Sequence, residues 1–413
     1  MNLSDVVCAP IDTYSTSRFV IIIGASLISA LGVACNILLI VAFCKLLRQK
    51  LKTKFWCTTV VYSRLCSELA TTVNSLEEMN LEQERTLLLR KPESHKTEFL
   101  YLTVLAGFDA SMCACFCVIF GMDALALYLR SELIYQFYHK IILSAFACNR
   151  IMELVIPYLY IVVTFEKWLQ SYKREGWMLD LTDTVTSDKA RTAFAVLTCL
   201  ICVALRLPIA WTLQLVNFPN CTEVCRSYQI LPAHTDLVEL YKMLDFYLGS
   251  ILGVFLPCLV LLALNVAILR NMRAAKLQAS LMKAMAMYKP VSVYAKADIK
   301  IGTVVQREIS EHEREEKRRL KEAHDATVSI AMLASSYLLC TTPSLVLTAF
   351  EHFFLQWLYS EDNVYMIWSD VVSILSMINS TISFFLLITC NQQIRKQVKK
   401  MVCFTVYLSA ILC

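Results

Sequence analysis

The chain alternates between long apolar segments and shorter polar ones. A helix needs about 20 mostly apolar residues to cross a bilayer. Seven segments meet this requirement, over residues 18–45, 99–126, 134–165, 191–217, 241–270, 325–351 and 364–390. Because lipid offers the backbone no hydrogen-bond partners, such segments fold as helices. The pattern therefore predicts an all-α membrane protein with a bundle of seven transmembrane helices.

Polar segments flank and separate these spans. They form an N-terminal segment over 1–17, a first connection over 46–97, a third cytoplasmic loop over 271–324 and a cytoplasmic tail over 391–413. The first connection is unusually long, and its most apolar stretch, 55–62, is too short to cross a bilayer. Three interpretations of the connection stay open: a true insertion, a segment lying on the membrane, and a retained intron.

Two of the polar segments have a helical pattern of their own. Residues 307–321 carry opposite charges at i,i+4 spacing, which predicts a solvated helix that runs into the sixth span. A docking surface for a cytoplasmic partner is the alternative interpretation. In the tail, Ile394, Val398 and Met401 recur at helical spacing among basic residues. We therefore expect a short amphipathic helix that lies against anionic membrane lipids.

Basic residues near the span ends predict the orientation, because cytoplasmic loops are enriched in Lys and Arg. Basic clusters follow the first and seventh spans and separate the third from the fourth: Lys45, Arg48, Lys50, Lys52, Lys54, Lys167, Lys173, Arg174, Lys189, Arg191, Arg395, Lys396, Lys399 and Lys400. The loop between the fourth and fifth spans holds only Arg226. We therefore expect a plasma-membrane protein with its N-terminus outside and its C-terminus in the cytoplasm. Glycosylation sequons at Asn2 and Asn220 then lie outside.

Composition narrows the classes of function. Of the 413 residues, 57% are apolar, and the net charge of +5 is small for this length, so we expect no nucleic-acid partner. The 18 cysteines lie mostly in apolar segments without a zinc-binding pattern. Enzyme motifs such as HExxH and GxSxG are absent, so we expect no enzyme, catalytic residue, metal or cofactor. The last span has no lysine for retinal, and the hydropathy lacks a transporter's internal symmetry.

Several residues within the spans are costly in lipid. Asn36, Asp109 and Asn379 are polar side chains that need partners on other helices. Glu153 is a further charge, one turn after Asn149. Pro343 lies in the middle of the sixth span, where a proline removes one backbone hydrogen bond and kinks the helix. It is either a hinge or a residue that only shapes the packing.

Landmarks in six of the spans occur in a familiar order. They are Asn36, Leu105-Ala-Gly-Phe-Asp109, Thr164-Phe-Glu-Lys-Trp168, Pro257, Cys340-Thr-Thr-Pro343 and Asn379-Ser-Thr-Ile-Ser383. With these landmarks, residues 18–390 resemble a rhodopsin-like (class A) G-protein-coupled receptor. The seventh-span string, Leu264-Asn-Val-Ala-Ile-Leu-Arg270 after Pro257, and Leu205-Arg-Leu-Pro208 further resemble the FMRFamide-type neuropeptide receptors of invertebrates.

The resemblance implies a receptor that converts an extracellular ligand, a short amidated neuropeptide, into activation of a heterotrimeric G protein. It implies a polar activation core made of Asn36, Asp109 and Asn379, with Ile156 standing where a serine often helps to bind sodium. It implies switch and hinge roles for Cys340, Thr341, Pro343 and Pro257, and G-protein coupling through Glu166, Lys167 and Trp168.

The resemblance also implies a ligand cavity beside the outer half of the third span. A peptide ending in Arg-Phe-amide needs a carboxylate to pair its guanidinium. We expect Glu153, next to Asn149, to be this carboxylate, while Arg150 is an alternative partner for it within the protein. The other candidate ligand contacts are Asp245, Glu351, Asp370 and the aromatic Trp368.

The chain departs from the family pattern at several landmarks. Lys167 stands in place of the coupling arginine and lacks its bidentate fork. Thr341 replaces the sixth-span tryptophan, and Asn265 and Ser383 replace tyrosines of the fifth and seventh spans. A non-signalling or decoy member of the same fold, or a chemosensory receptor, is therefore the alternative function.

The cysteine pattern also differs from that of the family. The third span has no cysteine near Ile142 to bond the second outer loop. Cys221 and Cys225 remain in that loop and can pair with each other or with Cys8. Cys403 follows the basic tail helix and is a candidate for palmitoylation.

Overall fold

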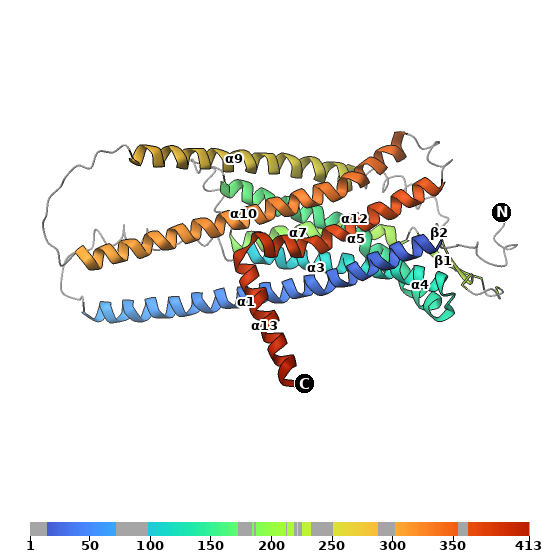
Figure 1. The fold of residues 1–413 in the computed structure, drawn as a ribbon, viewed down its shortest axis with the longest axis horizontal. Coiled ribbons are helices and arrows are strands. Elements are labelled where there is room, and N and C mark those ends of the chain that lie inside the picture. The colour runs from blue at the N-terminus through green and yellow to red at the C-terminus, as the bar shows by residue number, and fades with distance from the viewer. Residues whose placement is uncertain are drawn as a thin grey trace.

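Helices dominate the structure, a computed structural model. It describes residues 15–71, 98–171, 184–185, 187–211, 213–218, 221, 225–232, 251–287, 302–353 and 362–412. The long helices are α1 (Thr16–Thr71), α3 (Glu98–Phe116), α5 (Glu132–Ser171), α7 (Asp188–Arg206), α9 (Leu256–Met287), α10 (Gly302–Phe353), α12 (Asp362–Cys390) and α13 (Gln392–Leu412). All except α13 run along one elongated bundle (Figure 1).

Six helical stretches within the described residues are long and apolar enough to cross a membrane. They cover Thr16–Arg48, Leu100–Tyr128, Glu132–Gln170, Ile251–Ala274, His324–Leu347 and Met366–Cys390. These six overlap the predicted first, second, third, fifth, sixth and seventh spans. The chain is therefore a mainly helical membrane protein. The predicted count of seven spans requires that α7, which is not among these six stretches, also crosses the membrane.

The single helix predicted over 191–217 is wrong. Helix α7 ends at Arg206, and the chain continues through the short 3-10 helix η4 (Leu207–Trp211) into the strand β1 (Leu213–Asn217). The physical reason is Pro208, which has no N–H to continue the helix and whose ring clashes with the preceding turn. Strand β1 pairs antiparallel with β2 (Tyr228–Pro232), with Leu215 opposite Ile230. The second half of the predicted span thus forms a hairpin.

Helix α7 nevertheless has the surface of a lipid-facing helix. Large apolar side chains are exposed along it at Phe194, Val196, Leu197, Leu200, Ile201 and Leu205. The opposite face buries Arg191, Ala195 and Cys202 against the bundle. An exposed face made of large apolar side chains is unusual in water and ordinary in lipid.

Two spans contain a π-helical turn. The second span consists of α3, the π-helix η3 (Cys117–Met122) and α4 (Asp123–Tyr128). The described part of the fifth span begins with the π-helix η5 (Ile251–Phe255) and continues as α9, while its predicted first ten residues, 241–250, lie outside the described residues. Such turns interrupt the regular backbone ladder and often lie at functional sites.

Three helices extend beyond the predicted spans at the same end of the bundle (Figure 1). Helix α1 continues to Thr71, so the first part of the 46–97 connection extends the first span. Helix α9 continues to Met287. Helix α10 begins at Gly302, so the charged residues 307–321 are helical and continuous with the sixth span, as predicted.

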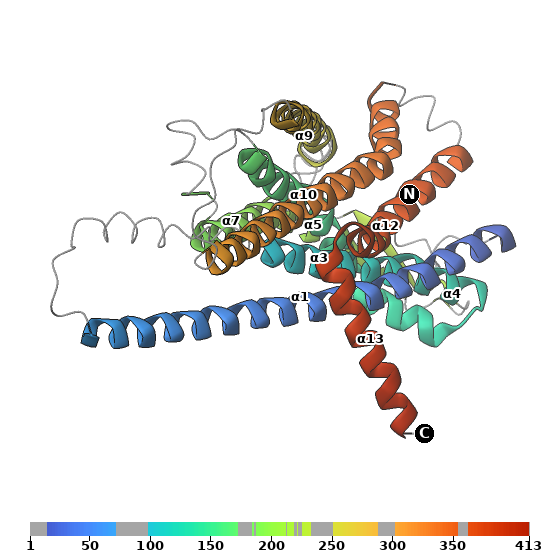
Figure 2. The same ribbon diagram turned by 60° about the vertical axis from the view of Figure 1, so that its left-hand side comes forward.

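Helix α13 turns away from α12 and crosses α1 (Figures 1 and 2). Asn391 causes the break, because its side-chain Oδ1 accepts hydrogen bonds from the backbone N–H groups of Gln393 at 3.0 Å and Ile394 at 3.2 Å. A helix is present where the tail helix is predicted, but it is longer, and its predicted lipid-facing side lies against the bundle. Its apolar residues Ile394, Val398 and Met401 are buried in the core of the bundle.

The β-hairpin is fastened to the start of α5 by polar contacts. Tyr135 donates its hydroxyl to the carbonyl oxygen of Tyr228 at 2.7 Å and accepts from the Tyr228 N–H at 3.3 Å. Glu132 accepts from the backbone N–H of Cys225 at 2.9 Å. Tyr228 also stacks on His139, with ring centroids 5.4 Å apart. These contacts hold the hairpin against the start of α5. We call this end of the bundle the hairpin end and the opposite one the α13 end.

We predict that Tyr135→Phe loosens the hairpin from α5. Cys225 is a buried free thiol, and burial raises its pKa, so little reactive thiolate forms in the wild type. Loss of a hydroxyl that makes two hydrogen bonds should raise the rate at which a membrane-impermeant thiol reagent modifies Cys225 by about tenfold. Mass spectrometry of the labelled protein measures this rate. Tyr158→Phe, which removes a distant hydroxyl from the same helix, should have no effect; equal rates in the two variants would contradict the docking.

Candidate functional site

A polar cluster lies in the middle of the bundle. Asn36 of α1, Asp109 of α3 and Asn379 of α12 are all buried, as predicted from the cost of polar groups in lipid. Asn36 donates its Nδ2 to the backbone oxygen of Ser380 at 3.0 Å. Ser336 of α10 donates its hydroxyl to Oδ1 of Asn379 at 3.4 Å. The three predicted residues thus connect α1, α3, α10 and α12.

Asp109 is surrounded by serines of α12. The side chains of Ser380 and Ser383 interact with its carboxyl group, and Ser383 also lies 3.4 Å from the hydroxyl of Tyr160 on α5. Two buried oxygens, Oδ1 of Asp109 and Oδ1 of Asn36, have no hydrogen-bond partner. The cluster therefore keeps unused acceptor capacity. Asp109 forms no hydrogen bond with Asn36 or Asn379. The serines of α12 lie between these residues instead.

The serines and the tyrosine were missed as partners by the sequence analysis. Ser383 was noted only as a departure from the family pattern, while Ser336, Ser380 and Tyr160 were not considered. The signal of the serines is weak, because a serine hydroxyl can bond a carbonyl one turn earlier in its own helix. Ser383 does this with the oxygen of Asn379 at 3.1 Å.

The predicted hinge residue, Pro343, lies inside α10 and contacts α12. Trp368 donates its indole N–H to the backbone oxygen of Pro343 at 3.2 Å. Just before the proline, Thr341 and Thr342 donate their hydroxyls to the carbonyl oxygens of Tyr337 and Leu338. Such back-bonding threonines favour a bend, as the proline does.

The remaining predicted switch residues lie close to this region or in α9. Cys340 is a half-buried free thiol on α10. Pro257 lies where α9 continues directly from η5, so its missing N–H leaves a carbonyl of that π-helical turn without a backbone donor. Directly before it, the carbonyl of Leu252 in η5 accepts from the hydroxyl of Tyr158 on α5, at 3.0 Å.

Glu153 already has partners within the protein. Asn149 donates its Nδ2 to Oε1 of Glu153 at 2.8 Å, and Arg150 donates its Nη1 to Oε2 at 3.0 Å. The Arg150 and Glu153 side chains remain 41% and 35% exposed. Arg150 also lies over the ring of Phe146, 5.1 Å from its centroid. The alternative internal pairing is therefore present, on a side chain that the protein does not fully enclose.

The other candidate ligand contacts are distributed around the hairpin end. Asp370 of α12 forms an ion pair with Arg18 of α1, and Trp368, two residues earlier, is half-exposed and bonded to the backbone of Pro343. Asp245 and the side chain of Glu351 lie outside the described residues. No contact joins Glu153 to Asp370 or Trp368 among the described residues.

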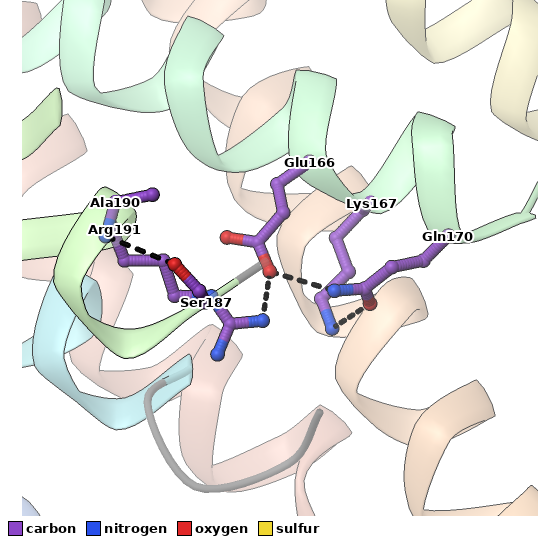
Figure 3. Close-up of polar contacts among 6 residues, drawn as sticks. All are labelled: Glu166, Lys167, Gln170, Ser187, Ala190 and Arg191. Carbon is purple, nitrogen blue, oxygen red and sulfur yellow. Dashed lines mark hydrogen bonds and ion pairs between the residues drawn. The ribbon is translucent and has the colours of Figure 1, made fainter. Parts of the chain in front are cut away.

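An ion pair lies at the α13 end, where α5 and α7 meet (Figure 3). Arg191, with a side chain that is 0% exposed, donates its Nη2 to Oε1 of Glu166. Gln170 donates to the same carboxylate oxygen at 2.6 Å, and Lys167 donates its Nζ to Oε1 of Gln170 at 3.1 Å. Glu166 and Lys167 are themselves buried. Two of the three predicted coupling residues thus belong to one network with α7.

The start of α7 places Arg191 in this network. Ser187 is the N-cap, and its hydroxyl accepts from the N–H of Ala190 at 3.3 Å, so Arg191 occupies the first turn of the helix. Trp168, the third predicted coupling residue, contacts the ring of Phe165, with ring centroids 5.7 Å apart. The sequence analysis used Arg191 only as an orientation signal. A buried Glu166 that needs a cation was the signal that could have identified it.

The modification sites are only partly described. Cys221 is disulfide-bonded, whereas Cys225 is a free thiol, so these two do not pair with each other. Cys8, the other predicted partner, lies outside the described residues, as do Asn2 and Asn220. Cys403 is an exposed free thiol on α13. Within the described part of the chain, no group of three or more His, Cys, Asp or Glu residues is arranged to hold a metal ion.

Comparison with known proteins does not assign the chain to a family. No protein-family description matches the chain, and no curated protein is significantly similar to it.

We predict that Glu166→Gln destabilises the protein strongly. The substitution leaves the buried guanidinium of Arg191 without its carboxylate, which typically costs about 3–5 kcal/mol. A lower melting temperature of the purified protein in detergent measures the loss. Lys189→Ala, which removes an exposed cation from the same helix, should melt like the wild type. The double variant Glu166→Gln/Arg191→Met should recover part of the loss; a Glu166→Gln variant as stable as Lys189→Ala would contradict a buried ion pair.

Proposed function

We propose that the protein is a plasma-membrane receptor of the rhodopsin-like class, which converts binding of an extracellular ligand into activation of a heterotrimeric G protein. The observation that carries this proposal is the attachment of α10 to α12 at Pro343 and two turns before it. Trp368 bonds the backbone at the proline, and Asn379 bonds Ser336 two turns earlier. Because Trp368 donates a hydrogen bond to the backbone of Pro343, a ligand that moves Trp368 acts directly on the hinge.

In the proposed mechanism, the part of α10 before Pro343 swings outward at the α13 end. The hinge bends where the proline and the two threonines weaken the backbone ladder. Movement of α12 against α10 changes the Ser336–Asn379 bond, and through Ser380 and Ser383 it changes the surroundings of Asp109. The unused acceptor oxygens let the cluster exchange partners without leaving donors unbonded.

At the α13 end, the proposed G-protein contact involves Lys167. In the described arrangement the Lys167 side chain is 3% exposed and bonded to Gln170. Activation therefore requires this ammonium group to leave Gln170 and enter the cleft that the swing of α10 opens. Glu166 stays paired with Arg191 during this step, because separating a buried ion pair is costly.

The proposed ligand is a short amidated peptide that carries an arginine. Each described candidate carboxylate holds a guanidinium of the chain itself: Glu153 binds Arg150 near the middle of α5, and Asp370 binds Arg18. These sites therefore have the chemistry that recognises a guanidinium. A peptide arginine would replace one such partner by exchange, so that no carboxylate is left unpaired.

A non-signalling or decoy receptor of the same fold is the second candidate, with a chemosensory receptor as a variant of it. The observation in its favour is the network in Figure 3, in which the cation that pairs with Glu166 comes from α7, while Lys167 is buried. A receptor locked in this way would bind its ligand without opening toward a G protein.

The test is a G-protein activation assay in cells after surface expression has been confirmed, with a panel of amidated peptides, amines and lipids. We predict a response to an arginine-containing amidated peptide that Glu153→Ala reduces at least tenfold in potency, because a charge-assisted bond is worth about 1.5–3 kcal/mol. Asn217→Ala in the exposed hairpin should keep the response. Binding of the peptide without any G-protein activation would favour the decoy, and silence to all ligands would contradict the receptor.

We also predict that Pro343→Ala lowers the maximal response while leaving peptide binding within about twofold. Alanine restores a backbone N–H and removes the steric clash, so the helix loses its preferred bend. Ser344→Ala, the neighbouring substitution, should respond like the wild type. An unchanged maximal response in Pro343→Ala would show that this proline only shapes the packing.

A further inference from the structure

Two thiols from different helices meet inside the bundle. Cys115 lies near the end of α3 and Cys148 lies in α5, and both are free cysteines. Their side chains are hydrogen-bonded to each other. Met112, one turn before Cys115, and Ile151, one turn after Cys148, pack in the same apolar core. The two helices are therefore in contact at the level of the two thiols.

The neighbouring cysteines of the second span have partners of a different kind. The thiol of Cys113 lies 3.7 Å from the hydroxyl oxygen of Thr381 on α12, and Cys117 donates its thiol to the backbone oxygen of Ser26 on α1 at 3.4 Å. Residues 113 and 117 are one helical turn apart and share a face, so Cys115 lies on the opposite face. This face is directed at α5, where the partner is the thiol of Cys148.

The position of Cys115 allows the two sulfur atoms to come closer. Thiols in hydrogen-bond contact must approach by less than about 2 Å to reach the length of a disulfide bond. The π-helix η3 begins at Cys117, two residues after Cys115. Because the regular backbone ladder is interrupted there, the end of α3 shifts more easily than the middle of a continuous helix.

The two thiols differ in how far the protein encloses them. Cys115 is buried, with an exposed fraction of 8%, whereas Cys148 is half-buried. Oxidation of a cysteine follows its accessibility, so a small oxidant reaches Cys148 first. The buried thiol of Cys115 is then already in contact with the oxidised sulfur. This is the arrangement of an attacking cysteine and a resolving cysteine.

We propose that Cys115 and Cys148 form a redox modification site, at which hydrogen peroxide produces a disulfide bond between α3 and α5. The sulfur of Cys148 attacks one peroxide oxygen, the O–O bond breaks, and Cys148 becomes a sulfenic acid while one water leaves. The sulfur of Cys115 then attacks the sulfur of Cys148, and the S–O bond breaks to release a second water. The two thiols lose two electrons, which reduce one peroxide to two waters.

The bond is reversible by the same chemistry in the other direction. A small dithiol attacks the disulfide, restores both cysteine thiols by thiol–disulfide exchange, and is itself oxidised to a disulfide. The site goes beyond the proposed receptor function and does not depend on it, because packing of α3 against α5 brings the thiols together.

The disulfide would change the surroundings of Glu153. Asn149, which follows Cys148 directly, donates its Nδ2 to Glu153, and the Glu153 carboxylate is close enough to Cys115 to interact with it electrostatically. A covalent bond at this level fixes α3 to α5 beside that carboxylate. It also closes residues 115–148 into a loop, which restricts the unfolded chain and raises the stability of the folded one.

The experiment treats the purified full chain in lipid nanodiscs with hydrogen peroxide, blocks the remaining thiols by alkylation in denaturant, and identifies tryptic peptides by mass spectrometry. Peptide 141–150 contains Cys148 and no other cysteine, while peptide 97–130 contains Cys113, Cys115 and Cys117. We expect the two peptides to be linked with the loss of two hydrogens, and dithiothreitol to separate them. The treated protein should melt about 5 °C higher than the untreated protein.

Serine variants identify the cysteine that takes part. Cys115→Ser should reduce the linked peptides by at least about tenfold and leave a sulfenic acid on Cys148, which a dimedone-type reagent labels. Cys113→Ser and Cys117→Ser are the matched controls on the same peptide, and both should keep the link and the rise in melting temperature. Without peroxide, all three variants are compared with the wild type by melting temperature, so that a folding defect is recognised.

Three results would overturn the proposal. The first is a wild-type chain in which peroxide leaves both thiols open to alkylation. The second is a link to peptide 141–150 that persists in Cys115→Ser, because Cys148 would then react with another cysteine. The third is oxidation of Cys148 to a sulfinic acid without any link, which would show that the Cys115 thiol does not reach the oxidised sulfur. Each of these results leaves the proposed receptor function as it stands.

Discussion

The constraint on which the structure depends is the cost of a charge where water cannot replace a lost partner. At each end of the bundle, a carboxylate that is withdrawn from solvent meets an opposite charge. Glu166 meets Arg191 and Gln170, and Asp370 meets Arg18. These pairs join different helices, so they determine which helices lie side by side. In the middle, Asp109 is placed among hydroxyl groups instead. The bundle therefore has three polar layers, one at each end and one in the middle, and apolar layers separate them.

This arrangement explains two features that apolar packing alone does not. Helix α7 is short, but its first turn carries the buried Arg191, which attaches it to α5. The hairpin that follows α7 returns to the start of α5 and is held there by Tyr135 and Glu132. Both attachments are polar and specific, so α7 is positioned at one end by an ion pair and at the other by the hairpin.

The sequence predicts the helices well because apolar length is a local property. It fails over 191–217, where Pro208 ends the helix and the apolar residues after it fit a strand equally well. The burial of Asp109 and Asn379 could be predicted from the cost of polar groups in lipid. Their partners could not, because Ser336 and Asn379, or Arg18 and Asp370, are far apart in the chain and meet only after folding. No local pattern marks such pairs.

The central claim is a receptor architecture with its ends on opposite sides of the membrane, which needs an odd number of crossings. Six helical stretches are apolar enough to cross, and α7 would be the seventh. The most direct measurement places one epitope tag before Met1 and another after Cys413, and stains intact and permeabilised cells. We predict that the first tag is accessible on intact cells and the second only after permeabilisation. Two tags on the same side would show that α7 does not cross, and would contradict the receptor.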